Sequence, residues 1–220
     1  MAVLAEERAL PTVVEAVPAA DPAPLGLAAF ALTTFILSGH NASFIPDIAW
    51  LGLAFFYGGL VQLLAGMWEF RNRNVFGATA FSTYGGFWMA LGFFVTLVVL
   101  SKSAAAAIAG SDLLNGLAWF LLAFSIFNFY MLLWSTRVSV AVCGVFLTLQ
   151  ITECLLTAGF FTEAHGGSAW LTHAGGWAGS AAGVINGMSV RPVLPVGAPI
   201  WDRLPFFSQL GSPIPRRTEA

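Results

Sequence analysis

The sequence predicts an all-α membrane protein with six transmembrane helices, and three observations support this fold class. The chain of 220 residues is 58% hydrophobic and 9% charged, with a mean hydropathy of +0.80, unlike an ordinary soluble domain. Its apolar stretches each have the roughly 20 residues that a helix needs to cross a bilayer core. Open sheets would leave backbone groups unpaired in lipid, so these stretches are expected to be helical.

The apolar stretches follow one another between residues 21 and 190, which we interpret as one transmembrane domain. The predicted spans cover, approximately, residues 25–44, 47–70, 76–100, 113–134, 138–161 and 168–190. Residues 1–20 lack a basic start followed by a long apolar region, so we expect a flexible N-terminal segment rather than a cleaved signal. Residues 191–220 are rich in proline and arginine and are expected to form an extended tail.

The basic residues are distributed unevenly between the two sides of the predicted helices. Eight of the nine fall on the side that carries both termini, namely Arg8, Arg71, Arg73, Arg137, Arg191, Arg203, Arg216 and Arg217. Only Lys102 falls on the other side. Cytoplasmic loops of membrane proteins carry an excess of lysine and arginine. Both termini are therefore predicted to be cytoplasmic, in a multi-pass protein of the plasma membrane, most simply the cytoplasmic membrane of a prokaryote.

The first and third spans each present a mixed face at helical spacing. In the first span this face holds Gly26, Phe30, Thr33 and Leu37, and in the third it holds Gly77, Phe81, Tyr84 and Trp88. Small, aromatic and hydroxyl-bearing side chains together suit a narrow lumen for a small solute. Ordinary helix packing, with each hydroxyl bonded to a backbone carbonyl, is the alternative.

Two polar side chains lie in or at the end of the second span. Gln62 is in mid-span, where a buried amide requires partners, so it is either a member of a structural network or a donor to a lumen. Glu69 lies beside Arg71 and Arg73 at the predicted cytoplasmic boundary. A local ion pair is the favoured interpretation of Glu69.

Glu153 is the acidic residue that the pattern places well inside a span. It shares a helical stripe with Phe146, Gln150 and Thr157, so it has polar neighbours. A carboxyl group inside a membrane is a functional hypothesis by default. Glu153 is accordingly either a group that exchanges protons or a structural hydrogen-bonding residue.

The sixth span contains glycines at every fourth position, Gly175, Gly179, Gly183 and Gly187. Such a ladder lets helices approach closely, so it is predicted to be a packing face, either within the subunit or between subunits. Cys143 and Cys154 have no metal-binding spacing, and no cofactor or metal is expected. With a net charge of −2 and no basic run, the chain gives no support for nucleic-acid binding.

Two long motifs carry a family resemblance. The first is DPAPLGL at residues 21–27, and the second is FYGGLVQLLAGMWE followed by NVFGATAFSTYGGFW, residues 56–88. In that order the two motifs resemble those of the acetate uptake transporter family, which comprises the bacterial succinate–acetate permeases and the fungal acetate permeases. The family has NPAPLGL where this chain has DPAPLGL, and SYG where this chain has TYG. The resemblance is strong over residues 21 to about 100 and looser toward the RPVLPVG stretch. Asp21 and Thr83 depart from the family pattern, and Asp21 adds a charge at the mouth of the pathway.

The resemblance implies a six-helix subunit, assembled as a homohexamer, with a pathway for acetate and related small carboxylates, succinate among them, in each subunit. It also implies a narrow hydrophobic constriction formed by Phe30, Tyr84 and, from the fifth span, Leu147. Asp21, Thr33 and Gln62 are expected at the mouth and along the polar lining of this pathway. Residues 21–190 would then be the transporter domain.

The spans contain no lysine or arginine, so no permanent cation can hold a carboxylate at mid-membrane. This favours transport of either a neutral acid or an anion accompanied by a proton, with hydroxyls, amides and helix N-termini bonding the carboxylate. The leading interpretation is a proton-linked transporter of acetate or small monocarboxylates. A passive channel for a small neutral solute, such as urea, an amide or the undissociated acid, is the alternative. A membrane-embedded enzyme is disfavoured because no nucleophile–base or HExxH spacing is present. A non-transporting sensor predicts no solute flux.

Overall fold

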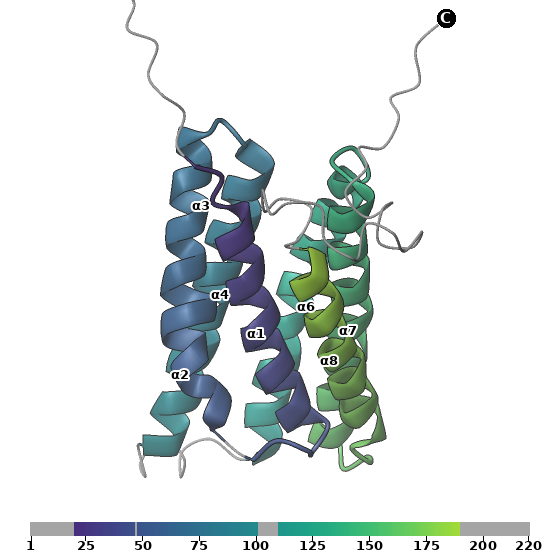
Figure 1. Cartoon of the computed structure of the whole chain (residues 1–220). Helices are drawn as coiled ribbons and strands as arrows, with labels where there is room; N and C mark the ends of the chain where they lie inside the picture. Colours follow the sequence, from purple (N-terminus) through teal and green to yellow (C-terminus); the bar gives the residue numbers. More distant parts are fainter. Residues whose placement is uncertain (1–19, 47, 101–109, 190–220) are drawn as a thin grey trace, which may run out of the picture.

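The computed structural model describes residues 20–46, 48–100 and 110–189, and every regular element in these ranges is helical (Figure 1). The helices coincide with the predicted stretches: α1 (Ala23–Asn41), the continuous α2–η1–α3 (Ala49–Arg71), α4 (Val75–Leu100), α6 (Gly110–Ser135), α7 (Val140–Ala164) and α8 (Trp170–Ser189). All but α8 are long and apolar enough to cross a membrane, which gives five candidate spans in the described residues. The prediction of an all-helical, multi-pass membrane protein is confirmed.

The second span is interrupted by a π-helical segment. It consists of α2 (Ala49–Phe55), η1 (Phe56–Val61) and α3 (Gln62–Arg71), and η1 carries the sequence FYGGLV. A Cβ atom at Gly58 would lie 2.6 Å from the Thr33 hydroxyl, so the glycine lets η1 pack directly on α1. Single π turns inside α-helices occur often at functional sites. Here the π turn ends at Gln62, whose side chain is fully buried in the bundle.

The helices form two halves that are joined by the first and last helix (Figure 1). Helices α1 to α4 make one half, in which α3 packs on α4, and α6, α7 and α8 make the other. Helix α8 lies along α1 and closes the bundle. The backbones of α4 and α6 stand apart, and aromatic rings bridge the space between them: the Phe87 ring lies 4.8 Å from that of Phe124 and 5.3 Å from that of Phe120.

The glycine ladder of α8 packs inside the subunit. A Cβ atom at Gly175 would lie 2.8 Å from Leu156 of α7, and one at Gly183 would lie 2.9 Å from the Ala31 carbonyl of α1. Gly179 faces both helices, in contact with Ser38 and Thr152. Of the two alternatives open from the sequence, the ladder therefore serves contacts within the chain at these three positions.

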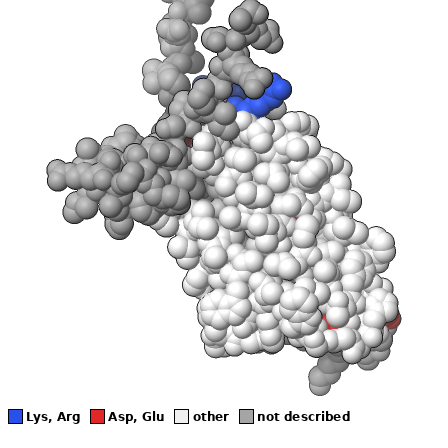
Figure 2. Space-filling model, turned by 90° about the vertical axis from the view of Figure 1, so that its right-hand side faces the viewer, with Lys and Arg blue, Asp and Glu red and all other residues white. Residues whose placement is uncertain are grey.

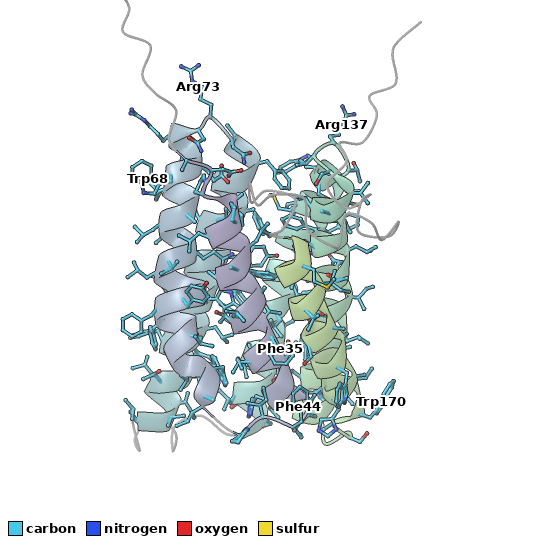
Figure 3. All side chains as sticks on the ribbon, viewed as in Figure 1. Phe35, Phe44, Trp68, Arg73, Arg137 and Trp170 are labelled. Atoms are coloured by element: carbon cyan, nitrogen blue, oxygen red, sulfur yellow. The ribbon has the colours of Figure 1, made fainter. Side chains whose placement is uncertain are left out.

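The two ends of the bundle differ in charge. Arg73 and Arg137 project from one end, whereas Phe44 and Trp170 lie at the other (Figure 3). The face shown in Figure 2 is almost entirely uncharged between the ends, as expected of a surface that contacts lipid. The three arginines in the described residues are Arg71, Arg73 and Arg137. Arg71 is the last residue of α3, and Arg73 and Arg137 lie two residues beyond the ends of α3 and α6. The other basic residues and the segments 1–19 and 191–220 lie outside the described residues.

Candidate transport pathway

A cavity of about 290 Å³ opens near the arginine-bearing end, and we call it the inner cavity. Its wall comes from α1, α3, α4 and α7, and most of it is apolar. The residues that line it are Asp21, Ala23, Leu27, Phe30, Gln62, Glu69, Asn74, Phe76, Gly77, Ala80, Phe81, Tyr84, Val138, Ser139, Ala141, Val142, Val145, Phe146 and Leu149. None of these is a lysine or an arginine, so any attraction for an anion must come from dipoles.

The N-termini of three helices converge on the inner cavity. Asp21 accepts a hydrogen bond of 2.9 Å from the Ala23 amide at the start of α1. Asn74 accepts one of 3.1 Å from the Gly77 amide at the start of α4, and Ser139 accepts one of 3.2 Å from the Val142 amide at the start of α7. Each N-terminus carries a partial positive charge, which partly compensates the two carboxyl groups in the wall, Asp21 and Glu69.

Two polar side chains in the cavity wall are buried with an unused oxygen. The Gln62 and Glu69 side chains are each 1% exposed, and each has one Oε1 without a hydrogen-bond partner in the part of the chain that the structure describes. The other Glu69 oxygen accepts a bond of 2.9 Å from the Asn74 amide, so among the described residues Glu69 pairs with Asn74 and not with Arg71 or Arg73. The ion pair expected from the sequence is therefore replaced by an amide contact.

Phe30 and Tyr84 meet in the inner cavity. Their ring centroids are 5.6 Å apart in an edge-to-face arrangement, and both residues are buried. Leu147 does not join them: it is 49% exposed and is absent from the cavity wall. Successive residues of an α-helix are rotated by about 100°. Phe146 and Leu149 therefore face the cavity while Leu147 points to the outside of the bundle, and Leu149 is buried at 6% exposed.

Asp21 and Thr33 differ in their relation to the cavity. Asp21 lies at the rim, where it is exposed and bonded to the N-terminus of α1. Thr33 is fully buried, and its hydroxyl donates to the Ala29 carbonyl at 2.8 Å. Thr33 packs on Gly58 and is not part of the inner cavity wall. Its hydroxyl is bonded to a backbone carbonyl, as expected for ordinary helix packing, and does not line the cavity.

A polar network sits behind Tyr84. The Tyr84 hydroxyl lies 2.9 Å from Asn128 Oδ1 and 3.4 Å from Glu153 Oε1. The Asn128 amide group in turn donates to the Phe146 carbonyl at 3.0 Å and to Gln150 Oε1 at 2.9 Å. The Tyr84 hydroxyl has one proton and can donate it to one partner. When it donates to Asn128 Oδ1, its contact with Glu153 is a hydrogen bond if Glu153 is protonated and donates to the Tyr84 oxygen. The network thus provides a place for an uncharged Glu153.

A second cavity, of about 280 Å³, opens toward the opposite end, and we call it the outer cavity. Its wall is formed by Leu37, His40, Asn41, Ile48, Trp50, Leu91, Val95, Val98, Val99, Leu113, Leu114, Leu117, Leu121, Leu156 and Phe160. It shares no lining residue with the inner cavity. Along α7, Leu149 lines the inner cavity and Leu156 the outer one, and Glu153 lies between them.

The layer between the two cavities is both aromatic and polar. We define this central layer as Phe87, Phe124, Asn128 and Glu153. Phe87 follows Tyr84 by one turn of α4 and precedes Leu91 of the outer cavity by another, and its ring contacts Tyr84 at 6.0 Å. Asn128 and Glu153 are 0% and 3% exposed. The central layer thus lies, along α4 and α7, between the residues that line the inner cavity and those that line the outer one.

Sequence reasoning did not single out Asn128, Leu149 or Phe87. Asn128 had a usable signal, because it is an amide in an otherwise apolar stretch, and a buried amide in a membrane requires partners. Leu149 and Phe87 had none, since each is one of many apolar residues in its helix and carries no polar group that requires a partner. Among the described residues, no cluster of three or more potential metal ligands is found.

A profile of the GPR1/FUN34/yaaH family matches residues 8–189. The chain belongs to this family. The resemblance that DPAPLGL and the FYGG motif indicated is thus confirmed. Proteins similar to this chain are named as an acetate permease, a succinate-acetate/proton symporter and an acetate channel, which are transport proteins and not enzymes.

Three members of the family illustrate the similarity. Acetate permease A of Emericella nidulans is 46% identical over 154 residues, which cover 67% of this chain and 51% of the permease. The succinate-acetate/proton symporter SatP of Escherichia coli is 33% identical over 189 residues, or 81% of this chain and 95% of the symporter. The solved structure of the bacterial acetate channel SatP matches with a TM-score of 0.71 at 29% identity, covering 81% of this chain and 99% of that one. The chain spans about half the length of the fungal relatives it matches.

Proposed function

We propose that the protein moves acetate and related small carboxylates, with succinate as a possible substrate, through a proton-linked pathway in each subunit. The observation that carries this proposal is the pair of cavities, one at each end, separated by the central layer. Named relatives that are an acetate permease, a succinate-acetate/proton symporter and an acetate channel support the choice of solute.

The electrostatics disfavour a bare carboxylate less in the inner cavity, where helix N-termini converge, than in the central layer. A helix N-terminus stabilises a nearby anion by about 1 kcal/mol in a partly buried setting, so three of them supply about 3 kcal/mol. A charge at the centre of a bilayer costs about 3 kcal/mol or more. The dipoles therefore offset the cost at the cavity but fade within a helical turn, and the central layer contains no cation. A carboxylate that crosses it is expected to carry a proton.

Glu153 is the proposed proton-exchanging group of this pathway. It is buried in the central layer, its Oε1 faces the Tyr84 hydroxyl, and its Oε2 has no partner among the described residues. A carboxyl group in that position can hold a proton through its bond to Tyr84 and pass it to a solute in the inner cavity, which Tyr84 also lines.

The hydrophobic constriction is proposed to consist of Phe30, Tyr84 and Leu149, with Leu149 in place of the Leu147 of the sequence-based assignment. Phe87 continues it toward the outer cavity. Apolar rings and a leucine exclude ions that keep their hydration shell and admit a solute that can shed water. Asp21 and Gln62 line the cavity on its inner side, where Asp21 would modulate the arrival of anions.

We also propose that α8 is the sixth span and that the subunits assemble as a homohexamer, as the family resemblance implies. The 20 residues of α8 rise about 30 Å, the thickness of a bilayer core. Its packing along α1 and α7 supports this arrangement.

Uptake of labelled acetate into proteoliposomes, with and without an imposed pH gradient, tests the proposal. Protein-free liposomes correct for acetic acid that crosses lipid unaided. We expect a gradient-dependent flux in the wild type, and in Glu153→Gln a flux that no longer responds to the gradient, because the amide keeps the size but cannot titrate. Glu163→Gln is the matched control, because Glu163 is also a carboxyl-bearing residue of α7 but lies near the C-terminal end of this helix and not in the central layer.

Each other outcome has a definite meaning. No acetate flux above that of protein-free liposomes would defeat the transport proposal. A wild-type flux that ignores the gradient, together with urea uptake, would favour the passive channel for neutral solutes. An unaltered pH profile in Glu153→Gln would assign Glu153 a structural role.

A further inference from the structure

We propose that Glu69 is a solute-binding residue of the inner cavity and that it holds the carboxyl group of the solute by sharing one proton with it. This inference rests on the proposed function and specifies the chemistry of its inner binding position. It concerns a residue for which the sequence suggested only an ion pair at the membrane boundary.

Glu69 combines three features: burial, a place in the cavity wall and a carboxyl oxygen without a hydrogen-bond partner. It is 1% exposed, lines the inner cavity, and leaves Oε1 without a partner among the described residues. A buried carboxyl oxygen without a hydrogen bond is costly, and in native structures such a group calls for an explanation. A solute in the cavity is the partner that the surrounding geometry leaves room for.

The neighbours of Glu69 hold it in this orientation. Asn74 donates to Glu69 Oε2 at 2.9 Å and at the same time caps α4 by accepting from the Gly77 amide at 3.1 Å. Gly77 leaves the space in front of the carboxyl group open. A Cβ atom there would lie 2.8 Å from Glu69 Oε1 and 2.5 Å from Asn74 Nδ2. The Asn74 side chain, which both caps α4 and bonds Glu69, and the absence of a side chain at Gly77 together form a pocket around Glu69 Oε1.

The charges around this pocket explain why a proton must be shared. Asp21, from the segment that leads into α1, is the other carboxylate in the cavity wall. The remaining polar groups of the wall are uncharged: Gln62, Asn74, Ser139 and the hydroxyl of Tyr84. Arg71 and Arg73 follow on the same segment as Glu69 but are exposed and absent from the wall. A bare carboxylate beside Glu69 would meet like charge without a compensating cation.

One shared proton removes this repulsion. A carboxylic acid donates one O–H bond, and a carboxylate accepts it in a short, charge-assisted hydrogen bond. The pair then carries a single negative charge, which the N-termini of α1, α4 and α7 face. The same arrangement disfavours a dicarboxylate that brings a second charge, so the pocket selects monocarboxylates and singly protonated dicarboxylates.

The test measures acetate uptake while the pH is varied on the side that bears Arg73 and Arg137. If binding takes up one proton, the apparent KM of the wild type falls by up to about tenfold for each unit of pH decrease. In Glu69→Gln the amide N–H donates to the anion without a proton, so the KM is expected to become flat with pH. Glu163→Gln keeps the wild-type slope, since that carboxyl group bonds Thr172 and is not part of the cavity wall.

A second measurement reads the shared proton directly. Infrared difference spectra recorded on addition of acetate should show a protonated carboxyl band that is retained in Glu163→Gln and lost in Glu69→Gln. If the band is absent from the wild type, or if Glu69→Gln keeps the pH slope, the inference is overturned. Absence of acetate uptake in the wild type defeats the proposed function instead, so the two failures are distinguishable.

Discussion

The Tyr84 side chain connects three helices at a single point. Its ring packs edge-to-face on Phe30 of α1, and its hydroxyl reaches Asn128 of α6 and Glu153 of α7. One residue thus belongs to the apolar constriction through its ring and to the polar network through its oxygen. Movement of the ring and a change in the hydrogen bonding of Glu153 are therefore physically linked, as proton-linked transport requires.

Leu147 and Leu149 of α7 provide a matched pair of variants. Leu149→Ala should enlarge the proposed constriction and raise the uptake of larger carboxylates, such as butyrate, relative to acetate. A shift of about tenfold in the ratio corresponds to 1.4 kcal/mol. Leu147→Ala should leave the ratio unchanged, because its side chain is half exposed. The measurement is competitive uptake in proteoliposomes, and equal ratios for the two variants would contradict the assignment of Leu149.

Residues on patterned faces could be placed from the sequence, whereas residues in uniformly apolar stretches could not. The spacing of glycine, aromatic and hydroxyl residues placed Phe30 and Tyr84 each on a mixed face of its helix, and the family resemblance implied that they meet. The structure brings them together. In α7 nearly every face is apolar because lipid and protein both accept leucine. Nothing in that pattern distinguishes Leu147 from Leu149, and the two differ by about 200° around the helix axis.

At the scale of the helices, hydropathy located every element to within a few residues. The predicted span 76–100 is α4 (Val75–Leu100), and the predicted span 138–161 is α7 (Val140–Ala164). The bilayer imposes this agreement, because its thickness sets the length of an apolar helix. The π segment η1 was not predicted, since it depends on close packing of its glycines against α1, and periodicity does not report such contacts.

The glycine ladder of α8 gives a prediction at this scale. Gly179→Leu should separate α8 from α1 and α7, because Ser38 and Thr152 already contact the glycine. Gly187→Leu is the control, since a Cβ atom at Gly187 would meet only Ala31, at 3.7 Å. We expect a lower thermal midpoint in detergent for Gly179→Leu, by several degrees or more, and little change for the control. A stable Gly179→Leu protein with unaltered packing would contradict the intramolecular role of the ladder.

At the scale of the whole molecule, the ends of the bundle predict its orientation. Single cysteines introduced into a cysteine-free background should react with a membrane-impermeant maleimide from one side only. Arg137→Cys and Met188→Cys should react from the cytoplasmic side, and Ser168→Cys from the opposite side. Reaction of Met188→Cys and Ser168→Cys from the same side would show that α8 does not cross the bilayer.

The way in which α8 is held has a consequence for biosynthesis. Among the long helices in the described residues, α8 is the one whose hydropathy falls short of that of a membrane span. Its glycines Gly175, Gly179 and Gly183 are covered by α1 and α7. The translocon inserts a helix according to its own apolarity, so a weakly apolar helix depends on partners that are already in the membrane. Because α8 follows α1 to α7 in the chain and packs on α1 and α7, the contacts between these helices form only after α8 has been synthesised. A nascent chain arrested after α7 would expose the groove between α1 and α7 to lipid and to membrane quality-control proteases.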